Sequence, residues 1–278
     1  CMKENFIWRY NGLEFGGIIW PVPSPSKVMV IVHGIGEHVG RYDEMALFFN
    51  QQNYLAVGID QYGHGRSTGR KGASKGFDFS FDYLSAFLNE VKQRYQKPII
   101  LYGHSMGGGL VTGFVLIRVP SIEAVIISSP ALLTYKKVPK YLLSILAMLN
   151  RLAPNLRVEQ GLDIQKSSHD PKAIEAFQQD ILNHSKMSIR LAYSMVKNGF
   201  WCLEHAHELK IPALLIHGDS DEFTSVKVSP LFAKTAPQQF LTYQEWPGGF
   251  HELHNEPNKK EVFNAISAWL NNLTVGHF

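Results

Sequence analysis

The chain has few cysteines, few charges and no long apolar run. Its 278 residues include two cysteines, Cys1 and Cys202, so a disulfide framework is not expected and a reducing compartment is favoured. Charged residues make up 18% and the net charge is only +3, which does not supply the clustered basic face of a nucleic-acid-binding protein. No apolar run reaches the ~20 residues of a membrane-spanning helix, and the first ten residues lack an apolar signal core. We therefore expect a cytoplasmic protein without a nucleic-acid partner, which could still touch a membrane from outside.

Short apolar runs alternate with segments of helical spacing along most of the chain. A hairpin is predicted for residues 5–20, around the turn pair Asn11-Gly12. Buried strands are predicted at 28–32, 55–59, 99–102, 122–128, 213–217 and 240–245, and helices at 43–52, 77–95, 105–119, 226–235 and 261–270. Buried strands that alternate with helices predict an α/β fold, with a mostly parallel central sheet and helices on both faces.

The alternation stops between residues 130 and 200. A break of this length predicts a helical cap, or lid, inserted after a strand. We therefore expect a core of residues 1–129 and 201–278 and a cap of residues 130–200, in one continuous structural unit. The apolar residues of the cap are expected to pack on the core or to face a lipid chain, and they could also join two copies in a homodimer: Tyr141, Leu142, Leu143, Ile145, Leu146, Met148, Leu149 and Leu152.

The segment Gly103-His104-Ser105-Met106-Gly107 lies between a predicted strand and a predicted helix. This G-x-S-x-G pattern is typical of a sharp turn, because side chains at Gly103 or Gly107 would collide with neighbouring backbone. The turn lifts the Ser105 hydroxyl to the carboxyl edge of the sheet, near the positive end of the following helix. We predict that Ser105 is a nucleophile. The alternative is a structural turn with an incidental serine.

A serine nucleophile needs a base within hydrogen-bonding reach and a carboxylate that orients the base. On an α/β fold of this kind the acid follows a late strand, and three acids follow the strand at 213–217. Asp221 is favoured because it can reach toward the histidine loop. Asp219 is the alternative and could instead close the turn, whereas Glu222 is expected to be a solvated charge.

The base is expected in the loop after the last strand, residues 247–254. We predict His251, which directly follows a glycine turn. His254 is the alternative, although it could instead cap the last helix or hydrogen-bond within the loop.

The reaction also needs N–H donors for the oxyanion of the tetrahedral intermediate. The backbone N–H of Met106, directly after the nucleophile, is one predicted donor. The other is the N–H of Ile35, in the glycine-containing loop at residues 33–38. Glu37 and His38 are expected to brace this loop by hydrogen bonds.

Several of these segments resemble the monoacylglycerol lipase and lysophospholipase-type α/β-hydrolases. The similarity is carried by His33-Gly34-Ile35-Gly36-Glu37-His38 with Gly40-Arg41-Tyr42, by residues 60–67 and by residues 103–108. It continues through Ser168-His169-Asp170-Pro171 and Phe177, Asp180 and Arg190 to residues 250–256. Because the match is collinear over nearly the whole chain, it is far more specific than the G-x-S-x-G segment alone.

The resemblance implies the α/β-hydrolase fold and a set of site residues. It implies Ser105 as nucleophile, His251 as base, Asp221 as acid, and Ile35 and Met106 as oxyanion donors. It also implies that the cap is a mobile lid that forms an apolar acyl channel and meets the membrane. The third elbow glycine, Gly109, and the cap sequence at residues 134–156 depart from the family pattern, so no acyl-length preference is predicted.

The sequence therefore predicts a carboxylic-ester hydrolase that cleaves monoacylglycerols to free fatty acid and glycerol through a Ser-His-Asp triad and an acyl-enzyme. A lysophospholipase and a general carboxylesterase or thioesterase are alternatives on the same scaffold. The alternative of another class is a non-catalytic, α/β-hydrolase-like binding protein. No metal or organic cofactor is expected, because this chemistry needs none and His64 has no second ligand at metal-binding spacing. The expected partners are a small lipid ester and, transiently, a membrane surface; the protein is expected to be a monomer or a homodimer.

Overall fold

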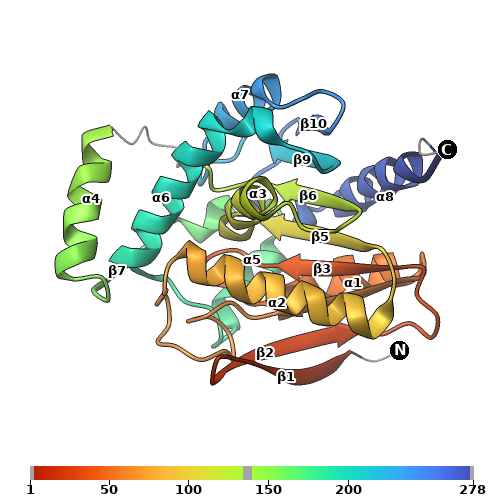
Figure 1. Cartoon of the computed structure of the whole chain (residues 1–278), viewed down its shortest axis with the longest axis horizontal. Helices are drawn as coiled ribbons and strands as arrows, with labels where there is room; N and C mark the ends of the chain where they lie inside the picture. Colours follow the sequence, from red (N-terminus) through yellow and green to blue (C-terminus); the bar gives the residue numbers. More distant parts are fainter. Residues whose placement is uncertain (1–2, 134–139, 276–278) are drawn as a thin grey trace.

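The computed structural model describes residues 3–133 and 140–275. An eight-stranded sheet in the order β1-β2-β4-β3-β5-β6-β9-β10 forms its centre (Figure 1). The strands are β1 (Glu4–Tyr10), β2 (Leu13–Trp20), β3 (Lys27–Val32), β4 (Tyr54–Ile59), β5 (Ile99–His104), β6 (Ala124–Ser128), β9 (Ala213–Gly218) and β10 (Leu241–Trp246). The β1–β2 and β2–β4 pairs are antiparallel, and all the others are parallel. The predicted hairpin and the mostly parallel sheet are confirmed.

Two layers of helices cover the two faces of the sheet. One layer holds α1 (Asp43–Asn50) and α8 (Lys259–Val275), and the other holds α2 (Phe77–Tyr95), α3 (Met106–Arg118), α6 (Ile189–Glu204) and α7 (Val228–Thr235). The 3-10 turns η1 (Val39–Tyr42), η3 (Ala206–Glu208) and η4 (Leu253–Asn255) join these elements. The predicted helices on both faces are therefore confirmed.

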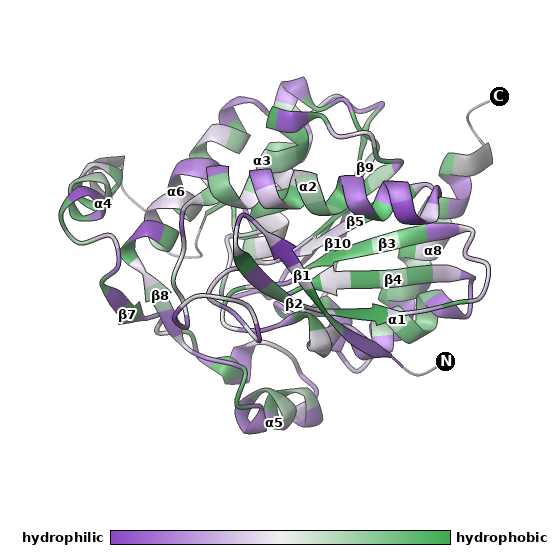
Figure 2. Ribbon diagram, turned by 60° about the horizontal axis from the view of Figure 1, so that its bottom comes forward, coloured by the Kyte–Doolittle hydropathy of each residue, from purple (hydrophilic) through white to green (hydrophobic). Residues whose placement is uncertain are grey.

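The alternating side chains of the central strands explain this arrangement. Along β3, Val28, Val30 and Val32 belong to the core beneath α2 and α3, whereas Met29 and Ile31 belong to the core beneath α1 and α8. Successive side chains of a strand point to opposite faces, so a strand without polar residues must be covered on both sides. Figure 2 shows the central strands β3 and β4 as largely hydrophobic ribbon between the helical layers.

The segment between β6 and β9 holds α4 (Lys140–Leu152), β7 (Arg157–Glu159), η2 (Ile164–Lys166), α5 (Pro171–Gln179), β8 (Lys186–Ser188) and α6. The antiparallel pair β7–β8 was not predicted, because three-residue strands are too short to show a periodicity. Residues 134–139, part of the predicted cap, lie outside the described residues. The division into a core (1–129 and 201–278) and a cap (130–200) stays a prediction.

Helix α6 crosses the predicted boundary at residue 200 and packs closely on α3. A Cβ atom at Gly113 of α3 would lie 2.0 Å from Oδ1 of Asn198, and one at Gly199 would lie 1.5 Å from the carbonyl oxygen of Leu132. The Asn198 side chain donates a hydrogen bond of 2.8 Å to the carbonyl of Gly109. Glycine at position 113 lets the two helices approach, and glycine at position 199 lets α6 approach the turn after β6, so α6 is anchored to the helix that follows Ser105.

Helix α4 lies at the edge of the molecule beside α6 (Figure 1). Leu143, Leu146 and Leu149 are half-buried, whereas Tyr141, Ile145, Met148 and Leu152 are exposed along one stripe of the helix. The side chain of Leu142 lies outside the described residues. Part of the apolar set thus packs inward and part faces solvent. Among the described residues, no helix has both the length and the apolar composition needed to cross a bilayer.

Candidate active site

Ser105 occupies a strained turn between β5 and α3. Its φ is 54° and its ψ is −117°, which is a backbone conformation that costs a non-glycine residue about 1–3 kcal/mol. A Cβ atom at Gly103 would lie 2.5 Å from the carbonyl oxygen of Gly107, and a Cβ atom at Gly107 would lie 2.1 Å from the carbonyl oxygen of Val32. The two glycines are therefore required by close backbone contacts, as the sequence predicted.

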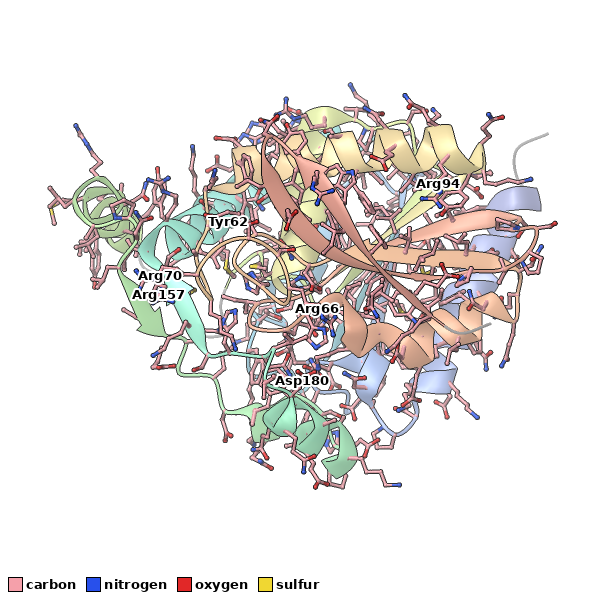
Figure 3. All side chains as sticks on the ribbon, turned by 90° about the horizontal axis from the view of Figure 1, so that it is seen from below. Tyr62, Arg66, Arg70, Arg94, Arg157 and Asp180 are labelled. Carbon is pink, nitrogen blue, oxygen red and sulfur yellow. The ribbon has the colours of Figure 1, made fainter. Side chains whose placement is uncertain are left out.

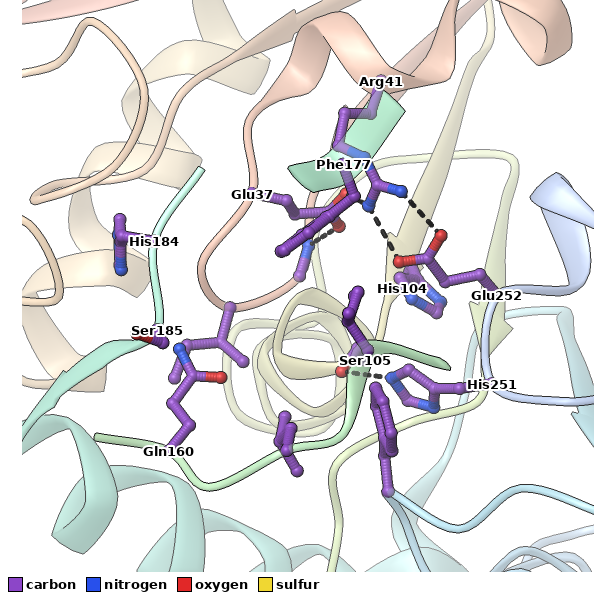
Figure 4. Close-up of a pocket in the computed structure, with 15 residues that line it drawn as sticks. Glu37, Arg41, His104, Ser105, Gln160, Phe177, His184, Ser185, His251 and Glu252 are labelled. Atoms are coloured by element: carbon purple, nitrogen blue, oxygen red, sulfur yellow. Dashed lines mark hydrogen bonds and ion pairs between the residues drawn. The ribbon is translucent and has the colours of Figure 1, made fainter. Parts of the chain in front are cut away.

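The structure brings the three predicted side chains into one hydrogen-bonded chain. Nδ1 of His251 lies 2.7 Å from Oδ2 of Asp221. Nε2 of His251 lies 2.8 Å from Oγ of Ser105, a contact that Figure 4 shows. An ionised carboxylate only accepts hydrogen bonds, so Nδ1 of His251 carries the proton donated to Asp221. Nε2 is then free to accept the hydroxyl proton of Ser105.

The pKa values of this pair are shifted by its surroundings. Burial alone would lower the pKa of His251, but the charge of Asp221 and the hydrogen bond to it raise that pKa above its ordinary value. Burial would raise the pKa of Asp221, but the two imidazoles of His251 and His217 hold it well below its usual range. Asp221 is thus ionised at neutral pH, and His251 has the basicity that a general base requires.

Asp221 is held by more contacts than the sequence indicated. Its Oδ2 also accepts hydrogen bonds from Nε2 of His217 at 2.9 Å and from the hydroxyl of Thr224 at 2.7 Å. Its Oδ1 accepts from the N–H groups of Phe223 and Thr224. Nδ1 of His217 faces the hydroxyl of Ser229 at 2.6 Å. His217 was not predicted as a site residue, because a histidine at the end of a buried strand gives no sign of its partner.

The other acids near Asp221 have structural contacts. Oδ1 of Asp219 accepts hydrogen bonds from the N–H of Gly248 at 2.8 Å and from the hydroxyl of Ser220 at 2.9 Å, so Asp219 closes the turn against the histidine loop. Glu222 is exposed and pairs with Lys166. Neither carboxylate contacts His251 among the described interactions.

The contacts of His254, the second candidate base, differ from those that the sequence led us to expect. Both of its ring nitrogens are buried without a hydrogen-bond partner in the described structure, so it neither caps a helix nor hydrogen-bonds within its loop. Its ring stacks on Tyr42 with the centroids 4.6 Å apart and contacts His104. Burial is the main cause that lowers its pKa to about 3, and His254 is therefore a neutral packing residue at pH 7.

The loop that holds Ile35 passes directly against Ser105. A Cβ atom at Gly34 would lie 3.2 Å from the Cβ of Ser105, and Ile35 lines the same pocket as Ser105. Oε1 of Glu37 accepts hydrogen bonds from the N–H of Gly34 at 2.5 Å and from the hydroxyl of Tyr42 at 2.7 Å. The predicted bracing by Glu37 is therefore present. Met106, the other expected donor, is buried in the first turn of α3.

A buried ion-pair group in the pocket of Ser105 was not predicted from the sequence. Arg41 donates two hydrogen bonds to the carboxylate of Glu252, at 2.8 and 2.7 Å, and one to Glu37 at 2.8 Å (Figure 4). Burial would raise the pKa of Glu252, but Arg41 holds it far below its usual value. Burial raises the pKa of Glu37, although Arg41 opposes the shift. The two carboxylates come from loops more than two hundred residues apart, which no local pattern connects.

The pocket above Ser105 encloses about 530 Å³, part of it open to solvent. Glu37, Arg41, Glu252 and His104 form one polar end of the pocket, and Gln160, His184 and Ser185 line it on the other side (Figure 4). The apolar lining residues are Ile35, Leu162, Ile164, Phe177 and Phe223. Within residues 3–133 and 140–275, no group of three or more His, Cys, Asp or Glu side chains is arranged to hold a metal ion. Nδ1 of His64 donates a hydrogen bond of 3.1 Å to the carbonyl of Tyr62 in its own loop.

A parallel sheet with a serine on the strained turn after β5, facing a histidine and an aspartate, defines a serine hydrolase with the α/β-hydrolase fold. The chain also matches the family described as serine aminopeptidase, S33, over residues 23–258. It therefore belongs to this family, and within it to the type that includes the monoacylglycerol lipases.

Curated relatives cover almost the whole chain. A monoacylglycerol lipase of Mycolicibacterium smegmatis is 31% identical over 271 residues, which span 96% of this chain and 96% of that protein. The phospholipase YtpA of Bacillus subtilis is 31% identical over 252 residues, or 90% of this chain and 97% of that protein.

Solved structures agree with the fold. The monoacylglycerol lipase of Paleococcus ferrophilus superposes with a TM-score of 0.86 at 29% identity and covers 94% of this chain and 99% of that one. A soluble variant of the monoglyceride lipase of Saccharomyces cerevisiae, in complex with a substrate analog, has a TM-score of 0.88 at 22% identity, over 98% of this chain and 96% of that one. The second likeness shows the fold alone. Together, these relatives confirm the predicted class of enzyme.

Proposed function

We propose that this protein hydrolyses monoacylglycerols to free fatty acid and glycerol. The observation that carries the proposal is the chain of hydrogen bonds from Ser105 through His251 to Asp221, in a pocket lined by both apolar and polar side chains. An ester with one acyl chain and a small polar alcohol has groups that suit both kinds of lining residue. The names of the relatives from Mycolicibacterium smegmatis and Paleococcus ferrophilus support the same substrate class.

In the proposed reaction, Ser105 attacks the ester carbonyl while Nε2 of His251 takes the hydroxyl proton. The N–H groups of Ile35 and Met106 bind the oxyanion of the tetrahedral intermediate. The C–O bond then breaks, and His251 donates its proton to the glycerol oxygen that leaves. Water attacks the acyl-enzyme with His251 again as base, which releases the fatty acid and restores Ser105. Throughout, Asp221 holds the tautomer of His251 and stabilises its cation.

The charge at the polar end of the pocket supports a neutral alcohol over a phosphodiester. Among the described pocket-lining residues, Arg41 is the only lysine or arginine, and two carboxylates accept three hydrogen bonds from it. Burial lowers the pKa of His104 well below its usual value, so that imidazole is neutral. The group of Glu37, Arg41 and Glu252 thus has no excess positive charge for a phosphate, whereas its oxygens can accept hydrogen bonds from hydroxyl groups.

The name of the Bacillus subtilis relative keeps a lysophospholipase as the second candidate. The two functions differ in the headgroup that must fit beside Arg41. A panel that pairs each glycerol monoester with the lysophosphatidylcholine of the same acyl chain separates them, since only the headgroup changes. We expect the glycerol ester to have the higher kcat/KM by at least about ten-fold, which corresponds to about 1.4 kcal/mol. A preference for the lysophospholipid would overturn the proposed substrate.

We also propose that residues 130–200 act as a lid that reaches a membrane surface. The stripe on α4 exposes 69% of Tyr141, 54% of Met148 and 76% of Leu152, and an exposed apolar stripe on an edge helix favours contact with lipid or with a second copy. Flotation with phosphatidylcholine vesicles tests this. Substitution of Met148 and Leu152 by serine is expected to abolish flotation, and flotation that persists would contradict it. Size exclusion of the same variant distinguishes loss of a dimer from loss of lipid binding.

A further inference from the structure

The segment of residues 177–184, here called the strap, connects the end of α5 to the approach of β8 and lies over the loop that holds Ile35. Its main chain and its side chains both contact that loop. The N–H of His184 donates a hydrogen bond of 2.8 Å to the carbonyl of Gly36. Nε2 of His38 lies 2.7 Å from Oδ2 of Asp180, and Figure 3 places Asp180 where α5 meets the core. The ring of Phe177 lies 4.8 Å from the guanidinium carbon of Arg41.

The backbone conformation of the loop allows the strap to approach it closely. Gly36 has a φ of +76°, and a Cβ atom there would lie 2.2 Å from the carbonyl oxygen of His184. A side chain at this position would therefore be strained and would also push the strap away. The contact is a backbone-to-backbone fit, and it lies one residue from the proposed oxyanion donor Ile35.

Asp180 accepts a hydrogen bond from within the strap through one oxygen and joins the strap to the loop through the other. Oδ1 accepts the N–H of Leu182 at 2.9 Å, and Oδ2 accepts from His38. Nδ1 of His38 accepts the N–H of Gly40 at 3.2 Å, so a neutral His38 carries its proton on Nε2 and donates it to Asp180. Burial would raise the pKa of Asp180, but these hydrogen bonds hold it below its usual value. An amide in place of the carboxylate could accept only one of the two donors.

The loop is held from two sides, with Ile35 between them. From the core, Glu37 accepts the N–H of Gly34, and Asp60 accepts the N–H of Val39. From the cap, the strap holds Gly36 and His38. The residues on both sides of Ile35 are therefore held partly by the core and partly by the cap. If the strap is released, only the contacts from the core remain.

We propose that Asp180 is a positioning residue for the oxyanion hole, and that the strap completes the hole when the cap is docked. This inference rests on the proposed function, because it takes the N–H of Ile35 as an oxyanion donor. A donor acts only if it points at the oxyanion before the charge develops, and loss of one donor reduces kcat by ~10²–10³-fold. Partial misplacement of Ile35 has a smaller effect in the same direction. The cap would then control both access and catalytic competence.

The test compares Asp180→Asn with the matched control Asp170→Asn in the full chain. Asp170 caps the other end of α5 through the N–H of Lys172 and lies 3.9 Å from Lys259 of the core. Its replacement by asparagine also removes a negative charge at the contact of cap and core, but it touches no residue of the oxyanion loop among the described contacts. Asparagine caps helices as well as aspartate does.

Both variants are assayed on p-nitrophenyl butyrate and on a glycerol monoester. For Asp180→Asn we expect kcat to fall about ten-fold on both esters with little change in KM, because the transition state loses stabilisation that the ground state does not use. The inhibition constant of a trifluoromethyl ketone, whose adduct places an oxyanion in the hole, should rise by a similar factor. Asp170→Asn should match the wild type in each measurement. Equal kcat for the two variants, or a change confined to KM, would overturn the inference.

A double-mutant cycle with His38→Gln checks that Asp180 acts through the loop. If the two residues act through one contact, the double variant should be no slower than the slower single variant. Additive losses would contradict the inference, and the melting temperature of each variant identifies a loss that merely reflects unfolding. A different result would contradict the proposed function. If the wild-type protein cleaves p-nitrophenyl butyrate but no glycerol monoester, the proposed substrate is excluded. The kcat values of Asp180→Asn and Asp170→Asn on p-nitrophenyl butyrate would then still test the role of Asp180.

Discussion

The carboxylate of Asp221 accepts the Nδ1–H of His251 at 2.7 Å, whereas Asp219, two residues earlier, accepts a backbone N–H from Gly248. Replacement of these two acids is therefore expected to have different effects on catalysis. For Asp221→Asn we expect kcat to fall by ~10⁴-fold, because the amide no longer holds the reactive tautomer of the imidazole. For the matched control Asp219→Asn we expect near-normal kcat, because the amide oxygen can still accept the N–H of Gly248. Steady-state kinetics on one ester decides, and the reverse order would assign the acid to Asp219.

The pH dependence of the same variants follows from the pKa of His251. Asp221 raises that pKa above its ordinary value against the effect of burial, so wild-type kcat/KM should decrease as the pH falls through the raised pKa and His251 becomes protonated. In Asp221→Asn the effect of burial prevails and the acid limb should move to lower pH. A pH–rate profile of the residual activity measures this shift. An acid limb that moves to higher pH, or does not move, would contradict the electrostatic account.

His217 extends the hydrogen-bonded chain beyond Asp221. Replacement of His217 by phenylalanine fills much of the space but removes one donor from the carboxylate, and a hydrogen bond to a charged group contributes about 1.5–3 kcal/mol. We expect kcat to fall by roughly ten-fold or more, with KM unchanged. Ser229→Ala is the control, because it removes only the partner of His217 and should have a smaller effect. Unchanged kcat in His217→Phe would show that the other donors of Asp221 are sufficient.

Arg41 is central to stability because it is the cation that pairs with two buried carboxylates. Arg41→Met should lower the free energy of unfolding by about 3–5 kcal/mol, since Glu37 and Glu252 then remain buried without their cation. In the wild type Arg41 lowers the pKa of Glu252, so this stabilisation is present at neutral pH and is lost as the pH falls. In the variant, burial raises the folded-state pKa of both carboxyls, and protonation removes their unfavourable buried charge. The difference in the free energy of unfolding between wild type and variant, measured by urea denaturation, should therefore become smaller as the pH falls from about 8 to about 5. A difference that becomes larger would contradict this.

The fold and the three side chains that meet at Ser105 could be predicted from the sequence, whereas the supporting contacts could not. The wholly apolar run Val28–Val32 and its counterparts predict buried strands, and Gly103 and Gly107 predict the turn at Ser105, because each signal lies within a few residues. The pairing of Arg41 with Glu252 and that of His38 with Asp180 join residues that are distant along the chain. Such pairs depend on how loops meet in space, and a single sequence contains no periodicity that reports it.

The central claim is that Ser105 cleaves esters of glycerol with one acyl chain. The most direct measurement is fatty acid release by wild type and Ser105→Ala from glycerol monoesters of increasing chain length. We expect kcat/KM to rise from the acetyl ester to longer esters, and the alanine variant to lose ~10⁶-fold in turnover, together with all labelling by a fluorophosphonate probe. Near-normal activity of Ser105→Ala, or a profile that is flat or falls with chain length, would contradict the account.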